Sequence, residues 1–491
     1  MADSELKRRT IRGFFWSSIE SVLSQGLGVI FGIFLARMLS PDEFGLLGMI
    51  TIFISISQVF VDSGLSQSLI RKQDCSATDY STVFWVNMII GLACYLIIWF
   101  ASPYIAAFYD NEQLVPITRI TSLSIIIVSF TLIQQTILTK DVDFKTLTKS
   151  SLAGTVVSGI AALALAYYGY GVWSLVWRSI INQAVRSAVL WANNRWKPVF
   201  SWNRKVFMEH FSFGSNILII SIISAIYRNI SNLIIGKSYS EKILGYYTNA
   251  DQYSTMPSST FTSITSKVSY PVFSELQNDT ERLRQHASKI TVSMAYISFT
   301  VMFGLAAMAK PLFGVILGEK WLPSVIMFQA LCFAYSISPI HVVNQNIMKA
   351  KGRPDLFLKT EIIKYGIFTP LLIAGAILGI EVLIAGIIIF YWAGYLVIAA
   401  YSKKLVGYSL KNQLYDFLPM MLVALVPALI TWSLGLIMKV SLLLLGLQVI
   451  LFPSLVILIS VLFRLPAFYE IKAILANKLT VSNFMKTFNP E

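Results

Sequence analysis

The chain has 491 residues, of which 56% are hydrophobic and only 13% are charged. Soluble domains carry about twice that share of charged residues, so the composition excludes a soluble enzyme, a secreted disulfide scaffold and a disordered chain. The net charge of +14 is expected of a membrane protein whose cytoplasmic loops are rich in lysine and arginine. It also suits an anionic ligand held inside the membrane, and no nucleic-acid partner is predicted.

Apolar windows follow one another along the whole chain. A transmembrane helix needs about 20 apolar residues, and dividing the sequence on this basis predicts an all-α integral membrane protein with about 14 transmembrane helices. After Leu465, apolar residues at helical spacing predict an interfacial amphipathic tail or, as the alternative, a frayed polar end. The windows lie near residues 13–36, 44–70, 81–103, 114–138, 150–168, 170–193, 211–235, 244–271, 287–309, 321–348, 358–379, 381–401, 415–437 and 440–463.

Basic residues gather in alternate linkers between these windows. Counted from a cytoplasmic N-terminus, the inside linkers hold roughly four times as many lysines and arginines as the outside linkers. This alternation predicts that both the N-terminus and the C-terminus face the cytoplasm.

A short internal repeat divides the chain. Residues 236–245 repeat the pattern of residues 36–45, with a small residue, a basic residue, a serine and a glycine in register. The copies follow the first and seventh windows, which predicts two six-helix bundles of equal orientation, related by a pseudo-two-fold axis, plus two C-terminal helices. The predicted domains are an N-terminal bundle at 1–205, a C-terminal bundle at 206–405, two additional transmembrane helices at 406–464 and a cytoplasmic amphipathic tail at 465–491.

Signatures of catalysis and of metal binding do not occur in the sequence. It has no His-Glu-x-x-His, no P-loop, no G-x-S-x-G and no Cys-x-x-Cys. The three cysteines and the three histidines are far apart. No outside linker is long enough for a catalytic platform, so the chain is predicted to be neither an enzyme nor a metalloprotein, and to need no cofactor beyond a coupling ion.

Two windows carry cationic stripes. Arg178, Asn182 and Arg186 in the sixth window are spaced by four residues and so share one helix face. In the seventh window Arg228 and Asn232 share a face with Ser221 and Ser224. Because arginine binds phosphate oxygens in a bidentate manner, both stripes are candidate sites for a phosphate-containing ligand. The alternative is that each arginine pairs with an acid on a neighbouring helix.

The acids and amides inside the windows are further candidates. Glu20, Asp62 and Asp251 are candidate sites for a coupling proton or sodium ion, or they neutralise arginines. Asp62 lies on one face with Ser55 and Gln58. In the tenth window His341 and Asn344 can hydrogen-bond sugar hydroxyls, although interhelical hydrogen bonding is the commoner role of such groups.

Several longer stretches carry a family resemblance. They are LARMLSPDEFGLLGMITIF from Leu35, DSGLSQSLIRKQ from Asp62, DYSTVFWVN from Asp79, SPYIAAFY from Ser102, LGYYTNADQYSTMPSS from Leu244 and YPVFSELQND from Tyr270. In these stretches the chain resembles the Wzx-type polysaccharide exporters, within the superfamily of multidrug, oligosaccharidyl-lipid and polysaccharide exporters. Relatives often place Asn-Arg-Ala after the tyrosines of the eighth span, whereas this chain has an acid, Asp251, close by.

The resemblance implies a flippase in the bacterial cytoplasmic (inner) membrane. Such proteins resemble two bundles around a cationic cavity, and they move undecaprenyl-pyrophosphate-linked oligosaccharide repeat units to the outer leaflet by alternating access, driven by a proton or sodium gradient. The product would be O-antigen, capsule or exopolysaccharide, with a polysaccharide polymerase and a chain-length regulator as further partners. The alternatives are a multidrug cation antiporter of the same superfamily, a flippase for the peptidoglycan precursor, and a membrane glycosyltransferase or polymerase.

Overall fold

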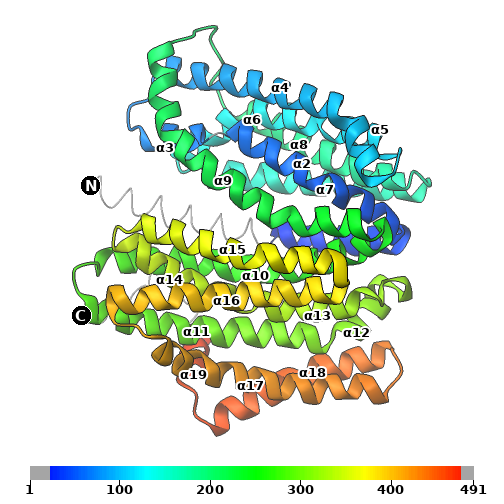
Figure 1. Ribbon diagram of the computed structural model, residues 1–491, viewed down its shortest axis with the longest axis vertical. Helices are drawn as coiled ribbons and strands as arrows, with labels where there is room; N and C mark the ends of the chain where they lie inside the picture. The colour runs from blue at the N-terminus through cyan, green and yellow to red at the C-terminus, as the bar shows by residue number, and fades with distance from the viewer. Residues whose placement is uncertain (1–22, 63, 477–491) are drawn as a thin grey trace. The chain divides into compact units, whose positions relative to one another are not determined.

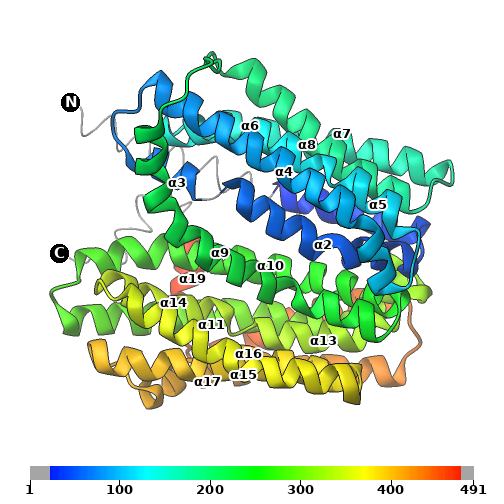
Figure 2. The ribbon, with the colours of Figure 1, turned by 45° about the horizontal axis from the view of Figure 1, so that its top comes forward.

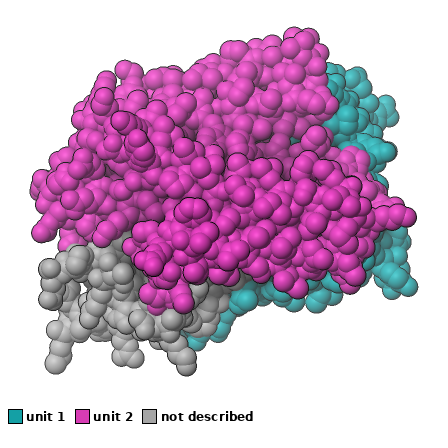
Figure 3. All heavy atoms as spheres, turned by 90° about the horizontal axis from the view of Figure 1, so that it is seen from below, with its two compact units in different colours: residues 1–248 teal, residues 249–491 magenta. Residues whose placement is uncertain are grey.

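The computed structural model describes residues 23–62 and 64–476, and every element in these residues is helical (Figure 1). The chain divides into two compact units, with the division between Thr248 and Asn249 (Figure 3). This division falls inside the long helix α10, Glu241–Glu275. The prediction of an all-α protein is confirmed, whereas the domain boundaries at 205, 405 and 464 stay predictions.

The first unit contains helices of very different length. An apolar helix, Leu23–Met38, opens the described part of the chain. In both views of the ribbon α4, α6 and α8 lie side by side (Figures 1 and 2), while α2 packs along α9 and α7 along α8. The helices are α2 Pro41–Asp62, α3 Leu65–Arg71, α4 Ala77–Tyr109, α5 Leu114–Thr121, α6 Leu123–Lys140, α7 Phe144–Tyr167, α8 Val172–Asn193, α9 Arg204–Ser238 and the start of α10.

The second unit holds the remainder of α10 and all later elements. Its main helix pairs are α11 with α17 and α15 with α16. Its elements are α11 Thr280–Ala307, α12 Ala309–Pro311, a π-helical turn Leu312–Leu317, a 3-10 turn Glu319–Trp321, α13 Ser324–Tyr335, α14 Ser338–Ala350, α15 Pro354–Leu378, α16 Ile380–Val406, α17 Leu410–Ile437, α18 Leu442–Leu462 and α19 Pro466–Ala476.

The predicted tail begins as a helix. α19 packs against α11, with Ala467 buried and the Ser293 hydroxyl donating to a Glu470 carboxylate oxygen at 3.5 Å. Leu475 lies in this helix, while Leu479 falls outside the described residues. Placement of the tail at the membrane interface stays a prediction.

Each predicted window that lies within the described residues coincides with one helix or with two consecutive helices. Among these residues, ten helical segments are long and apolar enough to cross a bilayer. The described part of the first window, Leu23–Met38, is shorter. α8 and α10 are long enough but too polar to qualify. Because lipid does not tolerate exposed polar groups, these two helices must turn their polar faces to protein or to water. The total of 14 spans stays a prediction.

The repeated segments meet at a tight helix crossing. A Cβ atom on Gly45 of α2 would overlap the carbonyl oxygen of Glu241 at the start of α10, and one on Gly245 would overlap the carbonyl oxygen of Pro41. In the repeat Gly45 is equivalent to Gly245, and Pro41 is equivalent to Glu241, 200 residues later in each case. Each glycine therefore contacts the position equivalent to the one that the other glycine contacts. This reciprocity is what a local two-fold relation between the two segments produces, and glycine is required because only its missing side chain lets the two backbones approach.

Polar side chains fix several helix starts. Ser76 and Asp79 form a reciprocal capping box at the start of α4, and the Asn203 side chain accepts hydrogen bonds from the backbone N–H groups of Lys205 and Val206 at the start of α9. Such caps satisfy N–H groups that have no partner inside the helix. They therefore define where α4 and α9 begin.

Candidate functional site

A cavity of the first unit lies between α2 and α9. It has a volume of about 490 Å³, within the range of small-molecule sites. Its lining combines hydroxyl and amide groups with one carboxylate and one guanidinium. The lining residues are Ser55, Gln58, Val59 and Asp62 of α2, Gly64 beyond its end, and Ser221, Ser224, Ala225, Arg228 and Asn229 of α9.

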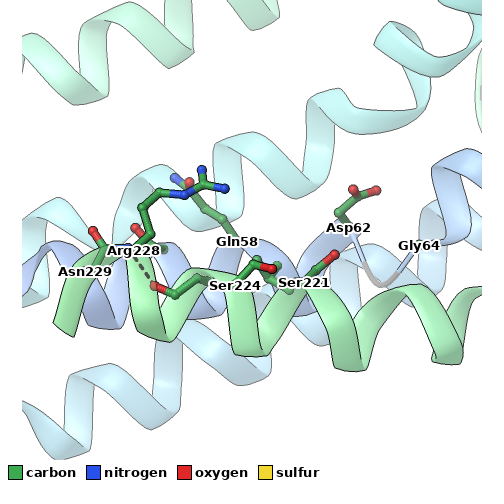
Figure 4. A pocket seen from close by; sticks show the side chains of 10 residues that line it. Gln58, Asp62, Gly64, Ser221, Ser224, Arg228 and Asn229 are labelled. Atoms are coloured by element: carbon green, nitrogen blue, oxygen red, sulfur yellow. Dashed lines mark hydrogen bonds between the residues drawn. The ribbon is translucent and has the colours of Figure 1, made fainter. Parts of the chain in front are cut away.

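The cavity joins the two polar stripes predicted for the second and seventh windows. The side chains of Asp62 and Arg228 extend to the same side of α9, with Asp62 toward the Ser221 end of the cavity and Arg228 toward the Asn229 end (Figure 4). Each stripe follows one face of its own helix, and the packing of α2 along α9 brings the two faces together. The site is therefore built by tertiary packing of two amphipathic faces.

Both charges in the cavity lack a partner among the described residues. Asp62 Oδ1 is buried without a hydrogen bond, and no described group forms an ion pair or hydrogen bond with Arg228. The Arg228 side chain is exposed to the cavity space, whereas the Asn229 amide is buried and donates to the Ala225 carbonyl at 2.9 Å. An uncompensated guanidinium in a polar cavity is chemically suited to an anion such as a phosphate.

A helix break adjoins the cavity. α2 ends at Asp62, Gly64 has a φ of +66°, and α3 begins at Leu65. Glycine adopts this left-handed conformation without steric cost. The break turns the chain at the end of the cavity and sets the direction of the short helix α3.

A polar cluster, here called the clasp, ties this region to α9. It comprises Ser68, Lys72, Asp79, Glu209 and His210. Lys72 Nζ lies 2.8 Å from Asp79 and 3.2 Å from Glu209, while the His210 ring lies 2.8 Å from Ser68 Oγ and 3.3 Å from Asp79. The hydrogen bond to Asp79 raises the pKa of the Lys72 ammonium above its ordinary value. The clasp joins α3 and α4 to α9, one of the two helices that line the cavity.

The predicted stripe on α8 lies outside the cavity lining. Arg178 donates to the Gly28 carbonyl at 3.4 Å, Asn182 donates to Ser158 Oγ at 3.3 Å, and Arg186 donates to the Gln135 side-chain oxygen at 3.1 Å. The Nε of Arg186 is buried without a hydrogen-bond partner. The stripe is thus a second group of cations in the first unit, and its role in binding stays a prediction.

The remaining candidates are dispersed. Asn232 lies on α9 beyond the residues that line the cavity, and Glu20 falls outside the described residues. In the second unit, Asp251 accepts a hydrogen bond from the Tyr335 hydroxyl at 2.5 Å. Buried Asn344 donates to Gln413 at 3.0 Å, and the Nε2 of His341 is buried without a partner.

Sequence reasoning did not single out Asn229, the helix break or the clasp. Asn229 lies one residue beyond Arg228, off the periodic stripe, so helical spacing alone would not select it. The clasp unites residues 142 positions apart, Ser68 and His210, which no local pattern reveals. The described part of the chain contains no group of three or more His, Cys, Asp or Glu side chains that could hold a metal ion.

The fold has counterparts among solved membrane transporters. The chain is similar to the lipid II flippase MurJ in an inward closed conformation, with a TM-score of 0.70 and 16% identity, over 92% of this chain and 99% of that chain. It is also similar to an inward-facing multidrug resistance MATE family transporter of the MOP superfamily, with a TM-score of 0.61 and 15% identity, over 80% of this chain and 98% of that chain. These likenesses define the class, which is a multi-pass membrane protein with the fold shared by MurJ and the MATE transporters.

Residues 34–326, more than half of the chain, match the family described as polysaccharide biosynthesis protein, and the chain belongs to this family. Teichuronic acid biosynthesis protein TuaB of Bacillus subtilis (strain 168) is 26% identical over 72% of this chain and 73% of its own length. Lipopolysaccharide biosynthesis protein WzxC of Escherichia coli (strain K12) is 24% identical over 75% of this chain and 76% of its own. The family resemblance seen in the motifs is confirmed.

Proposed function

We propose that the protein is a flippase that moves lipid-linked oligosaccharide repeat units across the bacterial cytoplasmic membrane by alternating access. The observation that carries the proposal is Arg228, a cation without a partner among the described residues, in a polar cavity of a multi-pass membrane protein. Family membership and the similarity to TuaB, WzxC and the succinoglycan biosynthesis transport protein ExoT of Rhizobium meliloti (strain 1021) support a polysaccharide precursor as cargo.

The chemistry of the cargo matches the cavity. A polyprenyl pyrophosphate needs fixed cations, its glycan needs hydroxyl and amide partners, and its lipid tail can stay in the bilayer. Arg228 supplies the cation, while Gln58, Ser221 and Ser224 supply polar groups. Asn232 lies further along the same helix, and the α8 arginines form a second cationic group for the passage of the headgroup.

The finer features of the proposal concern energy and partners. The cargo is undecaprenyl-linked, both termini are cytoplasmic, and a proton or sodium gradient drives transport without any other cofactor. Asp62, Asp251 and Glu20 are the candidate coupling acids. A polymerase and a chain-length regulator would take the flipped units onward, and the protein itself acts as a carrier and not as an enzyme.

Binding of a lipid-linked oligosaccharide to the purified protein tests the proposal. Arg228→Ala should weaken binding by about one to two decades, because a charge-assisted hydrogen bond contributes roughly 1.5–3 kcal/mol. Arg228→Lys should recover part of the loss, since it keeps the charge but not the planar fork. Arg282→Ala, at an exposed ion pair with Asp279 in the second unit, is the matched control and should bind normally.

Two further variants locate the headgroup. If the α8 stripe also holds the phosphates, Arg178→Ala and Arg186→Ala will each weaken binding in a protein that remains folded. Normal binding by a folded double variant would restrict the headgroup to Arg228. Normal binding by Arg228→Ala would remove the observation on which the proposed function depends.

A further inference from the structure

The linker between α8 and α9, residues 194–203, presents aromatic side chains on the surface of the first unit. Phe200 is 92% exposed and Trp202 is 57% exposed. The apolar surface continues onto α9, because Phe207 stacks on Trp202 and on the exposed Phe211 with ring centroids 5.6 and 5.3 Å apart. A connected apolar surface of this kind marks a place that another molecule or a membrane covers.

Hydrogen bonds hold the backbone of the α8–α9 linker in place. The carbonyl of Val199 accepts a hydrogen bond from Trp85 Nε1 at 3.1 Å, and the N–H of Val199 donates to Ser81 Oγ at 3.1 Å. The carbonyl of Trp196 accepts a hydrogen bond from the Gln134 amide at 3.2 Å. These contacts tie the linker to α4 and α6. A backbone held at these points keeps the aromatic side chains of the linker at the surface.

The same region carries a concentration of positive charge. Two basic residues precede the exposed aromatic side chains of the linker and two follow them. All four are exposed, and no described group forms an ion pair with any of them. The sequence contains no acidic residue between Asp143 and Glu209, so no acid of this stretch offsets their charge. The four cations are Arg195, Lys197, Arg204 and Lys205.

We propose that the α8–α9 linker is a docking surface for anionic phospholipids of the cytoplasmic leaflet. Its four cations contact the phosphate headgroups, while Phe200 and Trp202 insert at the boundary between headgroups and acyl chains. Aromatic rings and long cationic side chains both favour this boundary. Charge complementarity selects anionic lipid as the occupant, and the alternation of basic residues along the chain predicts that the linker is on the cytoplasmic side.

The spread of the cations favours a lipid surface over a single bound headgroup. They extend from Arg195 to Lys205 along an exposed linker and the start of a helix, and none of them lines the cavity between α2 and α9. A single pyrophosphate is best held by cations that converge on it, whereas a membrane surface attracts cations that are spread along it. The proposal therefore adds a second partner and does not depend on the identity of the cargo.

Docking of the linker would position a helix of the cavity. The linker ends at Asn203, whose side chain caps the first N–H groups of α9. The same helix carries Ser221, Ser224 and Arg228 of the cavity lining. A linker bound to headgroups thus holds the start of α9 at a defined depth in the membrane.

Photocrosslinking from the linker identifies the molecule that covers it. Full-length protein with Phe200→p-benzoylphenylalanine is placed in nanodiscs that contain equal amounts of phosphatidylglycerol and phosphatidylcholine with the same acyl chains, and the adducts are identified by mass spectrometry. Each basic residue near an anionic surface contributes about fivefold, so phosphatidylglycerol adducts should exceed phosphatidylcholine adducts by at least about fivefold. Ile450→p-benzoylphenylalanine, at a position that is 71% exposed in the apolar helix α18, is the control and should give equal amounts.

Removal of the charges tests the electrostatic part of the proposal. Replacing all four cations with glutamine should bring the adduct ratio at position 200 to about one. The double variant Lys403→Gln, Lys404→Gln, which removes two exposed cations at the end of α16, should leave the ratio unchanged. With the four cations intact, about 1 M salt should also lower the ratio, because the Debye length falls to about 3 Å.

Three results would overturn the proposal: no lipid adduct at position 200, equal adducts of the two lipids with the four cations intact, or an unchanged ratio after their replacement. A small molar fraction of a polyprenyl pyrophosphate is added in a last arm. A dominant adduct with this lipid would also overturn the proposal, since the linker would then recruit the cargo, whereas a retained preference for phosphatidylglycerol supports it.

Discussion

The clasp predicts that two acids in contact with the same lysine differ widely in importance. The Asp79 side chain is 4% exposed and lies 2.8 Å from Lys72, while the Glu209 side chain is 55% exposed and lies 3.2 Å from the same nitrogen. Asp79 also accepts hydrogen bonds from the backbone N–H and the hydroxyl of Ser76 at 2.7 and 2.6 Å. Replacing Asp79 with Asn removes the charge that compensates Lys72 and leaves an amide facing several donors.

The expected losses follow from burial. Breaking a buried ion pair by neutralising one partner costs about 3–5 kcal/mol, whereas an exposed pair contributes about 0–1 kcal/mol. For a unit of this size each kcal/mol lowers the melting temperature by roughly 2–4 °C. Asp79→Asn should therefore lower it by roughly 6–20 °C, and Glu209→Gln by at most about 4 °C. Thermal unfolding of the detergent-solubilised protein, followed by circular dichroism, measures both; equal small shifts would refute the role assigned to the clasp.

Two further predictions concern the helix crossing and the topology. Gly45→Ala and Gly245→Ala should each destabilise the protein by more than about 1 kcal/mol, because the added methyl group overlaps the backbone of the other helix. Gly366→Ala is the control, and with open space around it it should be neutral or stabilising by about 0.5–1 kcal/mol. Chemical denaturation of the three variants measures these changes, and an unchanged stability of Gly245→Ala would contradict the close approach. Reporter fusions at Lys205 should behave as cytoplasmic and a fusion at Asn111 as external, because basic linkers alternate along the chain; a cytoplasmic Asn111 would mean a miscounted span.

The helices of the fold were predictable because each apolar window is a local property of the sequence. The polar stripe of α2 could likewise be read from the spacing of Gln58 and Asp62. That this stripe faces Arg228 could not, because the packing of α2 along α9 is a tertiary contact between segments more than 160 residues apart. The sequence repeat indicated that Gly45 and Gly245 are equivalent, and the structure adds that these equivalent positions pack against each other's helix.

Sequence reasoning selected the arginines of α8 as a candidate site, together with the stripe of α9, because they recur on one helix face. The structure shows that Arg178 and Arg186 hydrogen-bond to Gly28 and Gln135, while Arg228 lines the cavity. Periodicity identifies a polar face but not the partner that covers it. The choice between the two stripes therefore depends on tertiary contacts, which the spacing of residues does not encode.

The most direct test of the proposed flippase is leaflet-resolved translocation of a lipid-linked oligosaccharide in proteoliposomes, with and without an imposed proton or sodium gradient. The wild-type protein should move the cargo between leaflets, and Arg228→Ala should slow this by about one to two decades while remaining folded. Translocation at the wild-type rate by folded Arg228→Ala, or no gain over protein-free liposomes with the wild type, would contradict the account.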